Sequence, residues 1–395
     1  MFKKINQCDI YVFMWCIYML QEVLYSPGII NQLLQLIMIL WCTVAMFKYM
    51  IQPTESSSIL RVTILLIAMY TIYGIIHILF GKAIMMHSQY IYLRFSLNSL
   101  APIFLFYFFT KNGELTSDRI RIYLPILIVI CILLFYKEES RALLKSNKEE
   151  VTNNGGYYFI ALIPFLFFYV KKPILQYLFL GIILLYVILA MKRGAILIGT
   201  VASMVFLYAN MKNSSRRTKI LVILSTIAIV VGISQYIDFM MSSSEYFTSR
   251  VDQTLEGNSS NRDIIYGTLW NSLILEPNPF YFYFGRGADS SLEVVGSFAH
   301  QDWLETFCNN GLVGVIILFY FFYILGKNVW KSKQYFPRII FYSFATLFII
   351  TFSKTLFSMS IQNLDMPITM LLGYFSYWIV ESTNNLENDY YDQDE

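Results

Sequence analysis

Long apolar segments recur along this chain of 395 residues and constrain its fold more than any other feature. Hydrophobic residues make up 57% of the sequence and charged residues only 14%, whereas soluble domains carry about 25% charged residues. A helix of about 20 apolar residues crosses a bilayer with every backbone group hydrogen-bonded internally. The sequence therefore predicts an all-α polytopic membrane protein.

Twelve segments fit this prediction. They are Asp9–Tyr25, Ile29–Tyr49, Ile59–Phe80, Gln89–Phe109, Arg121–Tyr136, Tyr157–Val170, Pro173–Ala190, Ala195–Asn210, Lys219–Gln235, Trp303–Leu325, Arg338–Phe352 and Asp365–Val380. The sixth is short, so we expect it or its neighbour to be tilted or re-entrant. The predicted organisation is nine helices in residues 1–235, a loop at 236–302, three helices in 303–380 and an acidic tail at 381–395.

The basic residues predict the orientation. More than half of the 29 Lys and Arg fall in alternate loops, including Arg216-Arg217 and the cluster from Lys327 to Arg338. Short loops rich in Lys and Arg stay in the cytoplasm. Both termini are therefore predicted to be cytoplasmic, and the 236–302 loop is predicted to face outward, in the periplasm of a bacterial inner membrane.

Charge and cysteine usage limit the possible functions. The net charge of +3 is too small to indicate a nucleic-acid partner. The five cysteines form no Cys-x-x-Cys motif, so neither a structural zinc site nor a disulfide framework is predicted. We expect no metal and no cofactor.

Several cations lie on the outer side in this topology, against the positive-inside rule. Lys192 and Arg193 form a tight connection between two predicted helices, and Arg94 lies one turn inside the fourth. These side chains either extend to lipid phosphate or line a substrate cavity. Lys354 also lies on this side, and its position indicates an ordinary surface charge.

The outer loop carries three further features. Ser260 and Asp263 form a helix-capping pattern, and Arg262 lies between them in the first turn of the helix. Together with the N–H groups of this helix start, Arg262 could contribute to a phosphate site. Gly285-Arg286-Gly287 predicts a tight backbone turn. His300 precedes the tenth predicted helix, and it can accept a proton near neutral pH, with Asp302 and Glu305 close in sequence.

At these residues the chain resembles the O-antigen polymerase and ligase superfamily of bacterial envelope biosynthesis. The shared features are Lys192-Arg193-Gly194-Ala195, Arg262 before an amphipathic helix, Phe284-Gly285-Arg286-Gly287, and His300-Gln301-Asp302-Trp303-Leu304-Glu305. Gln301 stands where the family usually has Asn. The resemblance covers residues from about Tyr186 to Tyr320, and the N-terminal half matches in hydropathy only.

The resemblance implies a metal-independent glycosyltransferase of the multi-spanning type, with a GT-C-like architecture. The implied donor is an undecaprenyl-pyrophosphate-linked oligosaccharide, and the implied partners are membrane lipid and a chain-length regulator protein. His300 would be the base toward the acceptor hydroxyl, and Arg193 and Arg262 would hold the pyrophosphate. Further contacts to the pyrophosphate or sugar would come from Arg94, Lys192, Gly285, Arg286, Gly287 and Glu305.

Three functions fit these residues to different degrees. A polymerase of repeat units for O-antigen, capsule or exopolysaccharide is the preferred interpretation. A ligase that transfers the glycan to lipid A-core has the same donor and differs in its acceptor. A transporter of the same lipid fits less well, because transporters carry internal repeats and polar residues at mid-membrane.

Overall fold

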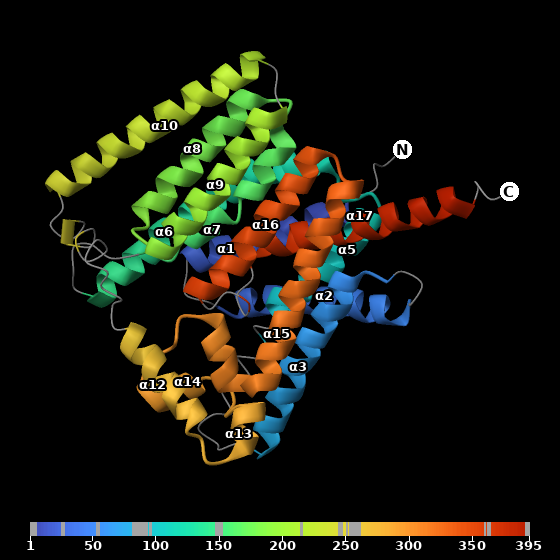
Figure 1. The fold of residues 1–395 in the computed structure, drawn as a ribbon, viewed down its shortest axis with the longest axis vertical. Helices are drawn as coiled ribbons and strands as arrows, with labels where there is room; N and C mark the ends of the chain where they lie inside the picture. The colour runs from blue at the N-terminus through green and yellow to red at the C-terminus, as the bar shows by residue number, and fades with distance from the viewer. Residues whose placement is uncertain are drawn as a thin grey trace. The chain divides into compact units, whose positions relative to one another are not determined.

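A computed structural model of the chain describes residues 6–24, 28–52, 56–80, 94, 97–146, 153–213, 216–243, 248–249, 252, 262–358, 361 and 365–391. Within these ranges the secondary structure is helical and contains no strand (Figure 1), which confirms the predicted all-α class. Ser260 and the first residues of the fourth predicted helix, Gln89–Leu93, lie outside the described residues.

The helices follow the order of the predicted segments. Their bounds are α1 Gln7–Leu24, α2 Ile29–Ile51, α3 Ser58–Phe80, α5 Pro102–Lys111, α6 Ser117–Ser146, α7 Gly156–Ile160, the 3-10 helix η2 Ile163–Tyr169, α8 Pro173–Leu189, α9 Arg193–Asn213, α10 Arg216–Ser243, α12 Arg262–Ile274, α13 Pro279–Phe284, α14 Ser290–Val295, α15 Asp302–Tyr335, α16 Arg338–Phe357 and α17 Met366–Tyr391.

Six of these helices contain a stretch that is long and apolar enough to cross a membrane, counted over the described residues. The stretches are Ile29–Ile51, Ser58–Ile76, Ser117–Ser140, Arg193–Lys212, Asp302–Tyr335 and Arg338–Phe357. Two shorter apolar segments, Gly156–Tyr169 and Pro173–Leu189, cover the sixth and seventh predicted helices. The chain is therefore an apolar all-α protein of the multi-pass membrane type, and the number of twelve spans stays a prediction.

The sixth predicted helix is divided in the structure. Helix α7 ends at Ile160, and a 3-10 helix begins at Ile163 after a turn. The cause is Pro164, because a proline ring collides with the carbonyl of the residue four positions earlier and cannot donate a backbone hydrogen bond. Four positions before Pro164 lies Ile160, so the Ile160 carbonyl cannot accept a helical hydrogen bond and α7 ends at this residue.

The chain forms two compact units. One contains Met1–Ser117, Ile265–Phe336 and Thr351–Glu395, and the other contains Asp118–Ile264 and Pro337–Ile350. In the first unit, α5 is buried against α2 and α17. The approach of α17 requires a glycine, because a Cβ on Gly373 would lie 2.6 Å from the Ile103 carbonyl oxygen.

In the second unit, α7, α8 and α9 pack together with η2. Their contact also depends on a small residue, since a Cβ on Gly156 would lie 2.7 Å from that of Ala190. Asn153 ties the preceding segment to this group, because its backbone N–H donates to the Ala190 carbonyl over 2.9 Å. These contacts hold the end of α8 next to the start of α7.

The prediction that Lys354 is an ordinary surface charge is wrong. Lys354 is 4% exposed, and its ammonium donates over 2.6 Å to the carboxylate of Asp365. The pair joins the last turn of α16 to the residue that precedes α17. A buried cation is retained only with a partner, because its desolvation is otherwise too costly.

Removing one member of this pair is expected to be more harmful than removing both. Lys354→Met should lower the free energy of unfolding by about 3–5 kcal/mol, because Asp365 is then buried without its partner. The double variant Lys354→Met with Asp365→Leu should recover most of this loss, as measured by thermal unfolding in one detergent. A single variant as stable as the double variant would contradict the assigned role of the pair.

Candidate active site

Helix α15 is broken at Gly311. This residue has φ +68° and ψ −165°, so residues from Asp302 to Asn310 form one half-helix and residues from Leu312 to Tyr335 form a second. A positive φ is favourable only for glycine among ordinary residues. The sequence Asn309-Asn310-Gly311 thus marks an interruption within the helix.

A helix end leaves its last carbonyls without helical partners, and three successive carbonyls before this break accept hydrogen bonds from other segments of the chain. The Cys308 carbonyl accepts from the N–H of Arg286 over 2.9 Å, and the Asn309 carbonyl accepts from the N–H of Gly287 over 3.0 Å. The Asn310 carbonyl accepts from the hydroxyl of Tyr73, on α3, over 3.1 Å. The Gly-Arg-Gly segment is therefore a cap for the first half of α15.

Two glycines allow this contact. A Cβ on Gly285 would lie 2.4 Å from the backbone of Asn309, and a Cβ on Gly311 would lie 2.4 Å from the Tyr283 carbonyl. Backbone thus packs directly on backbone. Gly285 and Gly287 were predicted to bind pyrophosphate or sugar. The structure gives Gly285 a packing role and Gly287 a hydrogen bond to the Asn309 carbonyl, and their contact with a substrate stays a prediction.

Glu305 is buried in the first half of α15 and organises the residues around it. Its carboxylate accepts from the Ser291 hydroxyl over 2.7 Å and from the Ala299 N–H over 3.0 Å. The Asn309 amide donates to the same carboxylate over 3.5 Å, and its own oxygen accepts from Ser290. Helix α14, the segment before α15, and α15 itself are joined by this network.

His300 directly follows Ala299, whose N–H donates to the Glu305 carboxylate. It has φ +52°, which places it in the left-handed region, and it is exposed. A left-handed conformation is uncommon for residues other than glycine, and asparagine, aspartate and histidine adopt it more often than the others. Residues in such conformations cluster at functional sites. The structure therefore presents an accessible imidazole on a fixed turn at the start of α15.

Arg286 is already engaged by the protein. Its guanidinium forms an ion pair with Glu276, in the connection between α12 and α13. Burial of the Glu276 carboxyl alone would raise its pKa. The hydrogen bond from the Asn278 N–H and the nearby Arg286 outweigh burial, so the pKa lies below its ordinary value of 4.5. The predicted substrate contact of Arg286 stays a prediction.

This pairing predicts a pH-dependent stability. A carboxyl with a lowered pKa stabilises the folded state fully above its ordinary value, and the contribution is lost as the pH falls through the lower folded value. Arg286→Met should therefore cost about 1–2 kcal/mol at pH 7, because the guanidinium is partly screened by solvent. The difference from the parent protein, followed by thermal unfolding, should shrink below pH 4.5.

Glu276→Gln is the matched control for this experiment, since it removes the titrating group and keeps the shape of the side chain. In the Glu276→Gln background, we expect the cost of Arg286→Met to show little pH dependence. An Arg286→Met effect that is the same at pH 7 and well below pH 4.5 would show that Glu276 is not its partner.

Arg94 lies in the same unit and reaches α2. Its guanidinium donates to the side-chain oxygen of Gln35, which is 4% exposed. Asn31, one turn earlier on α2, is also buried. This places the Arg94 cation among buried amides, a setting typical of a membrane protein's functional or packing cations.

The remaining predicted cations belong to the other unit. Arg193 is the first residue of α9, and Lys192 precedes it, directly after Met191 with φ +49°. Arg262 is the first residue of α12, three positions before the unit boundary. Helix starts therefore carry both predicted pyrophosphate-binding arginines, and their roles stay predictions.

Asp302 and Trp303 contribute contacts that the sequence motifs did not reveal. The Asp302 carboxylate accepts from the Ile361 N–H over 3.2 Å, and the Trp303 indole donates to the Thr355 hydroxyl over 2.9 Å. These bonds fix the start of α15 to the last turn of α16 and to the connection that follows it. Their partners lie more than fifty residues later in the chain, so sequence proximity gives no indication of them.

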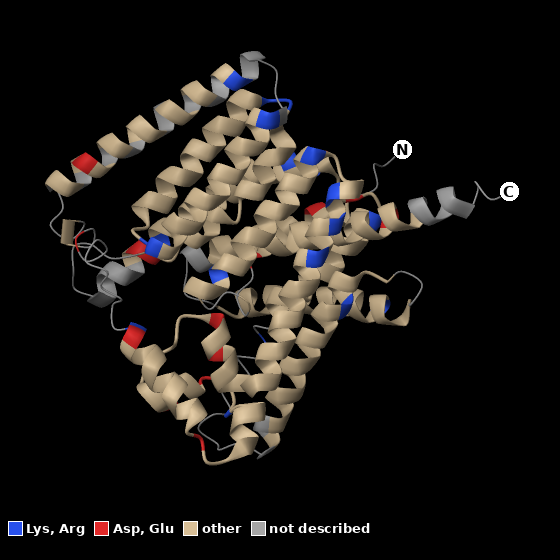
Figure 2. Ribbon diagram, viewed as in Figure 1, with Lys and Arg blue, Asp and Glu red and all other residues tan. Residues whose placement is uncertain are grey.

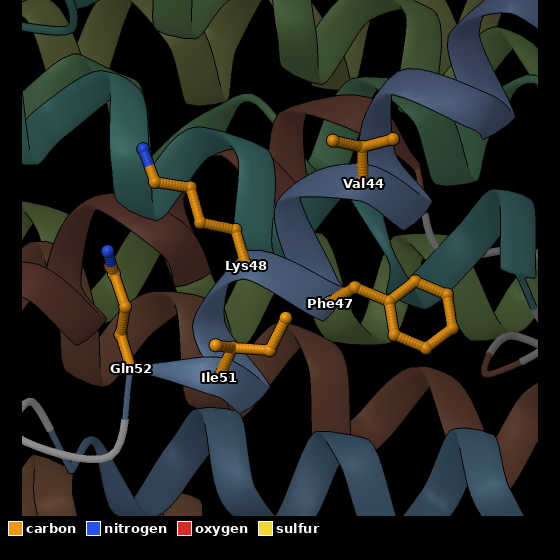
Figure 3. Close-up of a pocket in the computed structure, with 5 residues that line it drawn as sticks. All are labelled: Val44, Phe47, Lys48, Ile51 and Gln52. Atoms are coloured by element: carbon orange, nitrogen blue, oxygen red, sulfur yellow. The ribbon is translucent and has the colours of Figure 1, made fainter.

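A cavity of about 350 Å³ opens elsewhere, along the last turns of α2. Figure 3 shows its lining, which consists of Val44, Phe47, Lys48, Ile51 and Gln52. The Lys48 ammonium lies 4.7 Å from the centroid of the Phe108 ring. This cavity contains none of the predicted site residues, so we do not assign the candidate active site to it.

The fold and this site define the class of protein: a helical protein of the multi-pass membrane type, with a buried polar network at a broken helix that supports an exposed histidine. No protein-family model matches the chain, and no curated protein matches it.

Proposed function

We propose that the chain is a multi-spanning glycosyltransferase of GT-C-like architecture that polymerises undecaprenyl-pyrophosphate-linked oligosaccharide repeat units at the periplasmic face of a bacterial inner membrane. Its products would be O-antigen, capsular polysaccharide or exopolysaccharide. The resemblance of its motifs to the polymerase and ligase superfamily supports this proposal, as does the helical, apolar character of the chain.

The observation that carries the proposal is the setting of His300. An accessible imidazole on a turn that a buried carboxylate network holds is suited to general-base catalysis, which requires a positioned group with a pKa near neutrality. In the proposed reaction His300 accepts the proton of the acceptor hydroxyl. The hydroxyl oxygen bonds to the anomeric carbon of the donor sugar, and the bond from that carbon to the lipid pyrophosphate breaks.

The pyrophosphate leaves with the bonding electron pair, so the reaction requires stabilisation of negative charge more than protonation of the leaving group. Arginine suits this task because its guanidinium matches phosphate geometry. Arg193 and Arg262 are proposed for it on the basis of the motif resemblance. Arg94, Lys192 and Arg286 are further candidates.

Deletion of the gene, followed by electrophoresis of the surface glycan, tests the proposal. We expect glycan that contains a single repeat, restored to long chains by the intact gene. Full-length chains that remain on the lipid carrier would instead identify a ligase. Unpolymerised donor trapped in the inner leaflet would identify a transporter, and an unchanged glycan pattern would refute all three functions.

A further inference from the structure

Helix α13 presents an aromatic surface that is not covered within the described structure. We define this aromatic face by Phe280, Tyr281, Tyr283 and Phe284, whose side chains are 54%, 39%, 50% and 42% exposed. Such exposure is unusual for four large aromatic residues in a helix of six.

The opposite side of α13 attaches it firmly to the protein. The ring of Phe282 packs against that of Phe307 on α15, with centroids 5.5 Å apart. The Asn278 side chain caps the helix by accepting from the Phe280 N–H over 3.0 Å. The aromatic face is therefore held in a fixed orientation, with its polar end groups already satisfied at the start of the helix.

Contacts with α3 and α15 show where α13 lies along the length of these two helices. The Tyr283 carbonyl packs against Gly311 of α15, and the neighbouring Asn310 carbonyl accepts from Tyr73 of α3. Tyr73 lies seven residues before Phe80, the last residue of α3. Helix α13 thus lies near the C-terminal end of α3, beside α15 (Figure 1).

The exposed apolar surface of α3 extends through the same level. Ile72, Ile75, Ile76 and Leu79 are 55%, 46%, 42% and 68% exposed. A bilayer that covers these side chains also reaches α13. No charged residue occurs from Pro279 to Phe284, as Figure 2 shows for this helix, whereas Glu276 precedes it and Arg286 follows it.

We propose that the aromatic face of α13 is a membrane-interface anchor, seated in the lipid headgroup and upper acyl region at this end of α3 and α15. Its partner is the surrounding bilayer. Tyrosine and phenylalanine suit this position, because the boundary of a membrane favours side chains with a large ring and, for tyrosine, a polar tip. The inference depends on the membrane character of the chain and not on the proposed reaction.

The anchor has a consequence for the site. The N–H groups of Arg286 and Gly287, which cap α15, directly follow α13. An anchored α13 therefore sets the depth at which the first half of α15 lies, and with it the depth of His300 relative to the lipid headgroups. A polyprenyl pyrophosphate has its charged group at this boundary, so the depth of the histidine matters for the reaction we propose.

Thiol accessibility in phospholipid nanodiscs tests the anchor. Phe280→Cys and Phe284→Cys introduce reactive groups on the aromatic face, and Glu293→Cys, at an exposed position of α14, is the matched control. The five native cysteines are buried, so the parent protein gives the background. We expect a membrane-impermeant maleimide to react at least several-fold more slowly at positions 280 and 284 than at position 293.

A spin label on the same thiols provides a second measurement that does not depend on reaction rates. Labels at positions 280 and 284 should be more accessible to oxygen than to a water-soluble nickel complex, and the label at position 293 should show the reverse. Equal reactivity and high nickel access at all three positions would place the aromatic face in water. That result would overturn the proposal and leave a glycan or a protein as the occupant of the face.

Discussion

Replacing His300 with asparagine is expected to abolish polymer formation while the protein remains in the membrane at its normal level. General-base catalysis contributes about 10²–10⁴-fold to a reaction rate, and asparagine cannot accept the proton. It is also one of the few residues that adopts a left-handed conformation at low cost. The turn at φ +52° should therefore survive this substitution. The readout is chain length of the surface glycan in a deletion strain that carries the variant gene.

His300→Ala is the companion variant. Alanine also removes the imidazole, and it adds strain of about 1–2 kcal/mol in the left-handed region. Both variants should lack polymer, and only the alanine variant should show a measurable loss of thermal stability. Normal chain length in the asparagine variant would remove His300 from the reaction, whatever the alanine variant does.

Gly311→Ala is expected to be among the most destabilising single substitutions in this region. The added Cβ would lie 2.4 Å from the Tyr283 carbonyl and 2.5 Å from the Gly285 nitrogen, and neither backbone atom can move independently. Overpacking of this kind costs about 1–3 kcal/mol, and the left-handed conformation adds about 1–2 kcal/mol for a non-glycine residue. We expect a large fall in the melting temperature and loss of polymer in cells.

Gly296→Ala is the matched control for Gly311→Ala. Gly296 has nearly the same φ, +69°, but nothing lies within 4 Å of a Cβ placed there. Only the conformational cost should remain, so the protein should keep most of its stability. Similar melting temperatures for the two variants would show that close packing of Gly285 and Tyr283 on Gly311 contributes little.

The helical fold could be predicted from sequence because apolar length is a local property. The predicted segment Ile29–Tyr49 matches α2, Ile29–Ile51, almost residue by residue. The helix ends were harder to predict from the sequence, because several helices continue beyond their apolar part into more polar residues. Helix α10 extends to Ser243 and α17 to Tyr391, beyond the predicted ends at Gln235 and Val380.

The site was predictable where residue chemistry is distinctive and unpredictable where distant contacts decide. His300 and Glu305 stood out in the sequence, and the structure links them through the Ala299 backbone. Tyr73 could not be connected to Asn310, because 237 positions separate them in the chain. The burial of Lys354 could not be predicted either, because burial depends on which distant segments pack around a residue. The sequence near Lys354 indicates only the end of a helix.

The interruption at Gly311 also bears on how the protein enters the membrane during synthesis. A carbonyl without a hydrogen bond raises the free energy of a helix in the hydrocarbon core. If α15 inserted alone, the carbonyls of Cys308, Asn309 and Asn310 would lack the bonds described above. The groups that bond these carbonyls, on Tyr73, Arg286 and Gly287, all precede Cys308 in the chain. The ribosome therefore synthesises all three donors before it synthesises α15. Their hydrogen-bonding groups are present in the chain when α15 leaves the ribosome.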